Sequence, residues 1–198
     1  MKKIAIITSG GANFYSIEMA LERVGINYEL THDADVMNSA DGVLLPGVGS
    51  ASYAMEAFKR DGLIDAIRNY KKPLLGICLG MQLLFDYSEE GNVDCLGIIP
   101  GKITRFDDGK VIVPHMGWDS LSIEKDSPLL DGIDLSLEDL YFVHSFFAPI
   151  SDATIASCNY GTPFSAMVNK DNFYGMQFHP EKSSKTGEKL FANFAKIL

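Results

Sequence analysis

The feature that most constrains the fold is a short apolar run that ends in a cysteine between two glycines. Residues 73–82 read Pro-Leu-Leu-Gly-Ile-Cys-Leu-Gly-Met-Gln. The run behind the proline predicts a buried strand, and the glycine-flanked cysteine, followed by the mostly apolar residues 81–85, predicts a sharp turn into a helix. The apex of such a turn has a strained backbone, and strand and helix pass closely only if Gly76 and Gly80 lack a Cβ. The stretch therefore predicts a nucleophile elbow with Cys78 at its apex.

The elbow alone fits a small buried cysteine at a tight turn as well as it fits a catalytic nucleophile. A second run, near the C-terminus, complements it. Residues 173–181 predict a strand that leads into a histidine and a carboxylate. Because Pro180 disfavours the helical region for His179, we expect extended chain there, with residues two apart projecting to the same side. Glu181 would then reach the imidazole and fix its tautomer. The predicted catalytic group is Cys78 as nucleophile, His179 as base and Glu181 as the orienting carboxylate.

With these two runs the sequence resembles the class I (triad) glutamine amidotransferases. Within that family it is similar to the glutaminase subunits of imidazole glycerol phosphate synthase from histidine biosynthesis, over essentially the whole chain. The motifs that carry the resemblance are Pro-Gly-Val-Gly at 46–49, Gly-Ile-Cys-Leu-Gly-Met-Gln at 76–82, Pro-His-Met-Gly-Trp at 114–118, Tyr-Phe-Val-His-Ser at 141–145 and Gln-Phe-His-Pro-Glu-Lys-Ser at 177–183.

The resemblance implies a reaction and a partner. Glutamine would be hydrolysed to glutamate and ammonia through a γ-glutamyl thioester, without cofactor or metal. The ammonia would pass to a TIM-barrel cyclase subunit, in a heterodimer, that makes imidazole glycerol phosphate and an aminoimidazole carboxamide ribotide. By the same resemblance, the partner is contacted by Trp118, Tyr141 and Lys182. The chain departs from the family pattern at Thr8, where an acidic residue is common, and at residues 14–15, where a leucine and a polar residue are common.

Amide hydrolysis passes through a tetrahedral oxyanion, which preorganised N–H groups stabilise by about 3 to 4 kcal/mol. The N–H of Leu79, directly after the nucleophile, is one natural donor. The resemblance makes Val48 the second, with glycines on both sides that leave its peptide free to reorient. Without an elbow, the same residues would be read as an ordinary turn between a strand and a helix.

Recognition of glutamine is less visible in the sequence. Gln82 lies four residues after Cys78 and hence on the same helical face, although a solvated surface glutamine fits the pattern as well. By resemblance, Gln82 and Gly47, with the backbone of Ser145 and Phe146, bind glutamine.

The remaining histidines carry no such signal. No carboxylate follows His144 in register, so we expect His144, His115 and His32 to be core or interface residues. No spacing of histidines and cysteines suggests a metal site.

Composition limits the class of protein. The 198 residues contain 17 Lys and Arg against 26 Asp and Glu, a net charge of −9, which argues against nucleic acid or an anionic membrane as the partner. The apolar run at the N-terminus stops at Thr8, too early for a signal peptide, and three cysteines without framework spacing suggest a reducing compartment. We expect a soluble cytoplasmic protein in which residues 1–198 form one domain.

The rest of the chain alternates between strand and helix patterns. Strands are expected at 3–7, 28–31, 43–45 and 74–77, with helices after the first strand and at the C-terminus. This alternation predicts a doubly wound α/β fold of flavodoxin-like type, with a mainly parallel sheet, helices on both faces and ligands at the carboxyl ends of the strands. Between residues 97 and 147, short runs such as 111–113 and 141–143 predict antiparallel strands added at one edge.

Three alternatives stay open at this point. A γ-glutamyl hydrolase on the same fold would share Cys78 and His179 but act on γ-glutamyl peptides. A flavodoxin-like binding module would use neither residue chemically. A paralogous glutaminase would serve another synthase, for example in the amidation of surface sugars.

Overall fold

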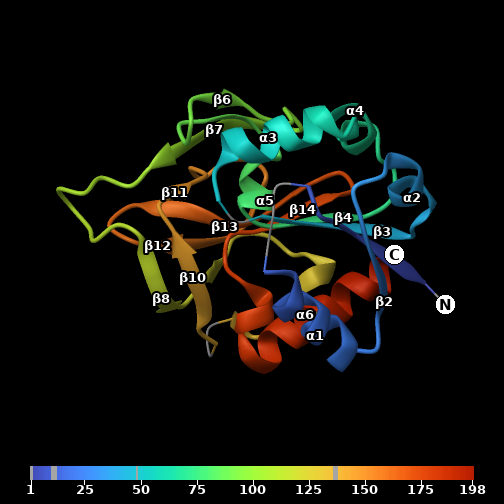
Figure 1. Cartoon of the computed structure of the whole chain (residues 1–198). Helices are drawn as coiled ribbons and strands as arrows, with labels where there is room; N and C mark the ends of the chain where they lie inside the picture. The colour runs from blue at the N-terminus through green and yellow to red at the C-terminus, as the bar shows by residue number, and fades with distance from the viewer. Residues whose placement is uncertain (1, 10–12, 48, 136–137) are drawn as a thin grey trace.

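The computed structural model describes residues 2–9, 13–47, 49–135 and 138–198, and the main feature of this part of the chain is an eight-stranded sheet (Figure 1). The strand order is β2, β1, β3, β4, β14, β13, β12, β9. In that order the strands span Asn27–Thr31, Lys3–Ile7, Gly42–Gly47, Leu74–Cys78, Phe173–Met176, Pro163–Lys170, Thr154–Asn159 and Ser122–Ile123. The first five are parallel to one another and the last three join antiparallel. This order confirms a mainly parallel sheet with antiparallel strands at one edge.

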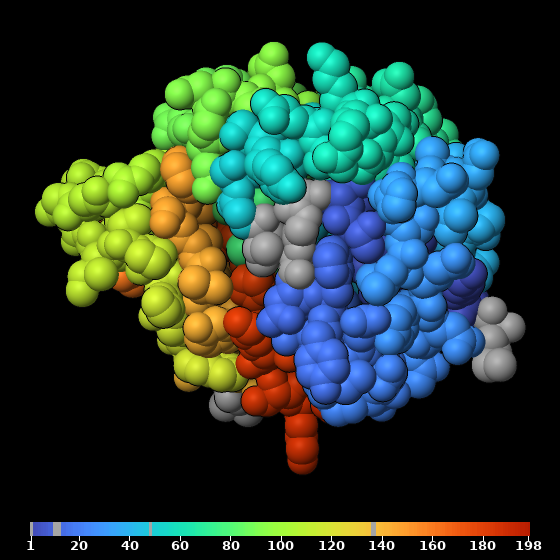
Figure 2. Space-filling view, viewed as in Figure 1, coloured from blue at the N-terminus to red at the C-terminus, as the bar shows by residue number. Residues whose placement is uncertain are grey.

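Helices cover both faces of the sheet (Figure 1). On one face α1 (Phe14–Arg23) packs against α6 (Ser184–Ile197), and Figure 2 shows the N-terminal and C-terminal segments side by side at the surface there. On the other face lie α2 (Ala34–Ser39), α3 (Ala51–Arg60) and α4 (Leu63–Arg68). The doubly wound arrangement is therefore confirmed.

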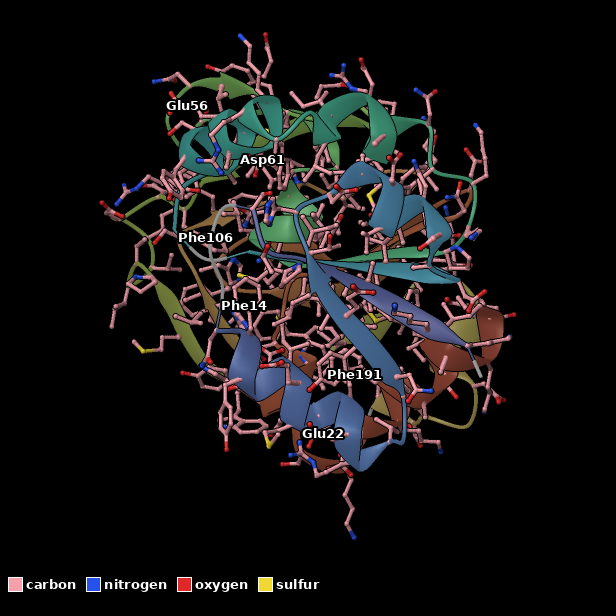
Figure 3. The ribbon with its side chains drawn as sticks, turned by 45° about the vertical axis from the view of Figure 1, so that its right-hand side comes forward. Phe14, Glu22, Glu56, Asp61, Phe106 and Phe191 are labelled. Carbon is pink, nitrogen blue, oxygen red and sulfur yellow. The ribbon has the colours of Figure 1, made fainter. Side chains whose placement is uncertain are left out.

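Each face of the sheet has its own apolar core. Phe191 is fully buried between the sheet and the α1–α6 layer, whereas Glu22 and Glu56 lie on the outer sides of their helices (Figure 3). In α1, Ile17 and Leu21 are buried one turn apart, as the helical pattern predicts. Among the described helices, none is long and apolar enough to cross a bilayer.

The segment from 97 to 147 differs from the prediction, because most of its strands form two separate small sheets. One contains β11 (Phe146–Phe147), β7 (Ile99–Arg105), β5 (Phe85–Ser88) and β6 (Val93–Asp94), and the other pairs β10 (Leu140–His144) with β8 (His115–Asp119). From this segment only β9, among the described residues, joins the edge of the main sheet.

Two local predictions are wrong. Residues 111–113 are not a strand but irregular, with Ile112 exposed, because the following Pro114 removes an N–H and restricts Val113. The elbow helix α5 (Leu79–Gln82) is also shorter than the expected 81–85 pattern, since Phe85 pairs with Ile99 in the small sheet.

Candidate active site

The elbow at the end of β4 has the strained geometry that the glycine spacing predicts. Cys78 is the last residue of β4, directly before α5, with φ 53° and ψ −111°, a positive φ that is uncommon outside glycine. A Cβ on Gly76 would lie 2.5 Å from the carbonyl oxygen of Gly80, and a Cβ on Gly80 would lie 1.6 Å from the carbonyl oxygen of Leu45. Only glycine therefore fits at both positions, at Gly76 because β4 passes close to α5 and at Gly80 because α5 passes close to β3.

His179 and Glu181 form the predicted pair, although the backbone differs from the prediction. His179 is extended, but Pro180–Lys182 form a 3-10 turn (η3) rather than a continued strand. The proline fixes φ at the first position of that turn, which brings the carboxylate back toward the ring. Oε1 of Glu181 lies 2.7 Å from Nδ1 of His179, and both side chains are buried.

Burial and hydrogen bonding act in opposite directions on His179. Burial alone lowers the pKa of His179, but interactions with Cys78 and Glu181 outweigh it and raise the pKa to about 10. The imidazole is therefore protonated at neutral pH, next to a sulfur and a carboxylate. Ser183 helps to fix the backbone of His179, since its hydroxyl donates to the main-chain carbonyl of His179 at 2.7 Å.

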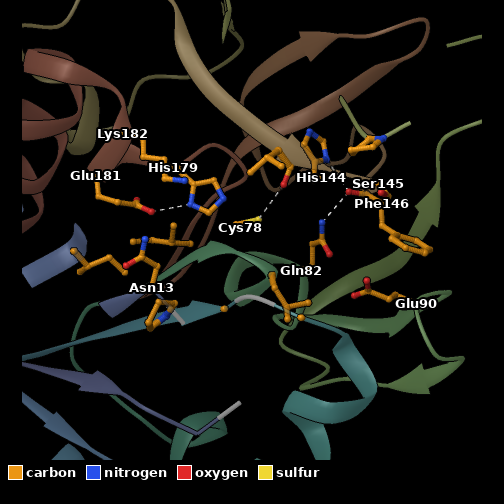
Figure 4. A pocket seen from close by; sticks show the side chains of 18 residues that line it. Asn13, Cys78, Gln82, Glu90, His144, Ser145, Phe146, His179, Glu181 and Lys182 are labelled. Atoms are coloured by element: carbon orange, nitrogen blue, oxygen red, sulfur yellow. Dashed lines mark hydrogen bonds and ion pairs between the residues drawn. The ribbon is translucent and has the colours of Figure 1, made fainter. Parts of the chain in front are cut away.

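These groups open into one cavity of about 380 Å³, shown in Figure 4. The structure brings together in its lining most residues that the sequence analysis singles out. These are Cys78, His179, Glu181, Leu79, Gly47, Gln82, Ser145, Phe146 and Lys182. Val48 lies outside the described residues, so its role stays a prediction.

The remaining predicted contact residues do not line the cavity but lie beside it. Tyr141 on β10 packs edge-on against Trp118 on β8, with 5.6 Å between ring centroids, and the Nζ of Lys182 lies 5.4 Å from the centre of the Tyr141 ring. Trp118 is about half exposed, at 52%. The three residues therefore form one aromatic and cationic surface next to the cavity mouth.

The three histidines without a predicted catalytic role differ in burial. His115 and His144 are buried, as expected, and they share a hydrogen bond of 3.1 Å between Nδ1 and Nε2. Burial lowers the pKa of His144 to about 3, so its ring is neutral. His32 is exposed, so of the two expected positions, core or interface, the interface stays a prediction for it.

Two site residues were missed by the sequence analysis. Glu90 lines the cavity from the turn after β5, and burial raises the pKa of its carboxyl despite a hydrogen bond of 3.0 Å from the N–H of Ala51. Gln177 is fully buried next to the sulfur of Cys78. Glu90 stands in a polar turn with no motif, whereas Gln177 belongs to one of the motifs that carry the resemblance and could have been found there.

Comparison with known proteins gives the family. The family described as glutamine amidotransferase class-I matches residues 5–198. The chain belongs to this family. Among the described residues of this amidotransferase, no group of three or more His, Cys, Asp or Glu side chains could hold a metal ion.

Individual relatives show to which group of glutamine amidotransferases the chain belongs. The amidotransferase is 46% identical over 202 residues to the imidazole glycerol phosphate synthase subunit HisH of Vibrio parahaemolyticus, covering 99% of this chain and 98% of that one. It is 48% identical over 195 residues to the imidazole glycerol phosphate synthase subunit HisH 2 of Legionella pneumophila, covering 98% of both. The amidotransferase therefore belongs to the HisH family.

Solved structures agree on the fold. A putative GMP synthase protein from Thermoplasma acidophilum superposes with a TM-score of 0.75 at 19% identity, covering 100% of this chain and 94% of that one. PurLQS from Thermotoga maritima superposes with a TM-score of 0.73 at 19% identity, covering 98% of both. At that identity the likeness concerns the architecture of the amidotransferase and not its chemistry.

Proposed function

We propose that this chain is the glutaminase subunit of an imidazole glycerol phosphate synthase, which hydrolyses glutamine and supplies ammonia to a cyclase subunit. The observation that carries the proposal is the cysteine on a strained elbow that shares a cavity with a buried, carboxylate-bound histidine. In this proposal residues 1–198 act as one domain. HisH relatives that match almost end to end support the choice of pathway.

The proposed reaction uses three side chains, Cys78, His179 and Glu181. The thiolate of Cys78 attacks the side-chain carboxamide carbon of glutamine, and the N–H groups of Leu79 and Val48 stabilise the oxyanion. Protonated His179 gives its proton to the departing nitrogen, which leaves as ammonia, and a γ-glutamyl thioester remains. The neutral imidazole then takes a proton from water, whose oxygen attacks the thioester and releases glutamate and the thiolate. Glu181 keeps the imidazole in the required tautomer throughout.

Substrate binding draws on groups around the cavity. Gln82, Gly47 and the backbone of Ser145 and Phe146 hold the polar ends of glutamine. Glu90 adds the carboxylate that an α-ammonium group requires, since it lines the same cavity and is partly buried. A substrate that lacks the α-ammonium group should therefore bind poorly.

The partner in this proposal is a TIM-barrel cyclase in a one-to-one complex, which uses the ammonia to make imidazole glycerol phosphate and an aminoimidazole carboxamide ribotide. The surface of Trp118, Tyr141 and Lys182 faces it, because aromatic side chains such as the half-exposed Trp118 are enriched at protein interfaces. The three cysteines are free, in keeping with a cytoplasmic location. Net charge disfavours nucleic acid and membrane partners.

The partner should also control the rate. A free glutaminase wastes glutamine, so we infer that the peptide of Val48 becomes a donor only when the loaded cyclase favours that conformer. A thousandfold effect needs about 4 kcal/mol of differential binding. Steady-state glutamate release should be slow for the chain alone and rise steeply with cyclase and its ribotide ligand together. Full activity of the chain alone, particularly on γ-glutamyl peptides, would favour the γ-glutamyl hydrolase instead.

Two substitutions test the chemistry in the complex. Cys78→Ala should lower glutamate release by at least about a thousandfold, because it removes the nucleophile and little volume. Glu181→Gln should leave weak activity, since the histidine remains but its tautomer is no longer enforced. Glutamate release by Cys78→Ala at the wild-type rate would refute the assignment.

A further inference from the structure

One buried amide connects the substrate side of the cavity with the nucleophile. Gln177 is 0% exposed and follows β14. Its Oε1 accepts from Nε2 of Gln82 at 2.9 Å, and its Nε2 donates to Sγ of Cys78 at 3.7 Å. The proposed mechanism uses Gln82 and Cys78 but gives no role to the side chain between them.

The orientation of both amides follows from a single carbonyl. Nε2 of Gln82 lies 2.8 Å from the carbonyl oxygen of Phe146, and a carbonyl oxygen only accepts (Figure 4). Gln82 therefore points its NH₂ group at that oxygen and uses its second hydrogen on Gln177. Gln177 must therefore turn its oxygen toward Gln82, and its NH₂ group then faces the sulfur of Cys78.

The anchoring carbonyl is itself held from its other side. Nδ1 of His144 lies 2.8 Å from the same oxygen of Phe146, so Nδ1 carries the proton. Nε2 of the neutral ring then accepts from Nδ1 of His115. With two donors on one oxygen, the carbonyl of Phe146 cannot turn without breaking both bonds.

We propose that Gln177 is a further catalytic residue, which donates a hydrogen bond to the Cys78 thiolate and fixes Gln82 with Oε1 toward the cavity. The inference rests on the proposed function and extends it. An N–H···S bond stabilises the charged sulfur more than the neutral one, as charge-assisted bonds are the stronger kind. It also keeps Sγ in position on the strained elbow while the substrate enters.

The same side chain sets part of the specificity. Both hydrogens of Gln82 Nε2 are taken by Phe146 and Gln177, so the atom that Gln82 offers to a ligand is an acceptor. The site therefore selects a hydrogen-bond donor on the substrate at this point, an ammonium or amide N–H group, and disfavours a carboxylate there. Loss of Gln177 frees the Gln82 amide to turn over and removes that selection.

Two substitutions separate the two roles in the complex with cyclase. Gln177→Met keeps the shape but removes donor and acceptor, so both kcat and KM for glutamine should worsen. Gln177→Glu keeps the acceptor for Gln82 but places a carboxylate against the thiolate, so kcat should fall about tenfold or more while KM stays within about twofold. In both variants, alkylation of Cys78 by iodoacetamide at neutral pH, followed by mass spectrometry, should slow about tenfold or more.

Asn193→Leu is the matched control, because Asn193 is another buried amide, which donates to the carbonyls of Leu129 and Asp131 far along the chain from the elbow. It should lower stability but leave the alkylation rate of Cys78 unchanged. Wild-type alkylation and kcat in both Gln177 variants would overturn the inference, as would an equal loss in Asn193→Leu. Activity retained by Cys78→Ala would instead overturn the proposed function, so the two failures are distinguishable.

Discussion

Gly80 offers a sharp test of the close approach between the elbow and β3. By helix propensity alone, Gly80→Ala inside α5 should stabilise the protein by about 1 kcal/mol. The structure predicts the opposite, because the new Cβ would lie 1.6 Å from the carbonyl oxygen of Leu45, whereas real Cβ contacts stay above 3.0 Å. The backbone of β3 or of the elbow would have to move by well over an ångström.

The expected size follows from these opposing terms. Overpacking against backbone costs about 3 kcal/mol or more, which leaves a net destabilisation of about 2 kcal/mol after the propensity gain. For a chain of this length that lowers the Tm by about 4 to 8 °C, measurable by calorimetry or circular dichroism. Glutaminase activity should fall as well, since the displaced strand carries Gly47 into the cavity lining.

Gly42→Ala is the control for this experiment. A Cβ on Gly42 would lie 2.2 Å from Cδ2 of Leu198, which is the end of a flexible side chain at the chain terminus. That side chain can rotate away, and the remaining contact, 3.2 Å from the carbonyl oxygen of Pro73, needs a shift of only a few tenths of an ångström, so we expect a change below about 1 kcal/mol. A Tm of Gly80→Ala at or above the wild-type value, or an equal loss in Gly42→Ala, would refute the argument from backbone approach.

Two further predictions concern ionisation. Burial raises the pKa of the Cys95 and Cys158 thiols to about 12, so brief iodoacetamide treatment of the folded protein at pH 7 should label Cys78 at least about tenfold faster; equal labelling of all three, by mass spectrometry, would contradict it. Because burial lowers the pKa of His144 to about 3 while the unfolded chain titrates near 6.5, the unfolded state binds the extra proton between these values. The free energy of unfolding should therefore fall as pH drops from about 6.5 toward 3, by up to about 1.4 kcal/mol per pH unit. When the free energy of unfolding is measured by urea denaturation at several pH values, it should change less steeply with pH in this window for His144→Gln than for the wild type. An unchanged pH dependence would argue against a neutral buried ring.

The elbow could be predicted because its requirement is local. The spacing of two glycines around a cysteine is enough to predict the crossing of one strand and one helix, although the atom that excludes a Cβ at Gly80 is the carbonyl oxygen of Leu45 on β3. The pairing of His179 with Glu181 was predicted for the same reason, since two residues apart on one chain can meet in more than one backbone conformation. The 3-10 turn that joins them was not predicted, because the restriction by Pro180 acts on the residue before it and leaves the following turn open.

Other parts of the site depend on contacts between distant segments. The mostly apolar residues 81–85 fit a helix as well as a buried turn, and the pairing of Phe85 with Ile99 decides between them. Gln177 and Glu90 become part of the site only because the fold brings the end of β14 and the turn after β5 to the same cavity. The periodicity of the sequence does not predict which distant segments line the same cavity.

The position of β4 in the sheet has a consequence for biosynthesis. Its neighbours are β3, which precedes it directly, and β14, where Gly175 pairs with Gly76 from the last part of the chain. During translation, the strand that carries Cys78 therefore has a free edge until residues 173–176 have been made. Pairing at such long sequence separation is slow, and one edge of this apolar strand lacks its neighbour at least while residues 79–172 are made. Cys78 cannot meet His179 before β14 docks, so in the proposed mechanism the growing polypeptide cannot consume glutamine until residues 173–179 have been made and packed.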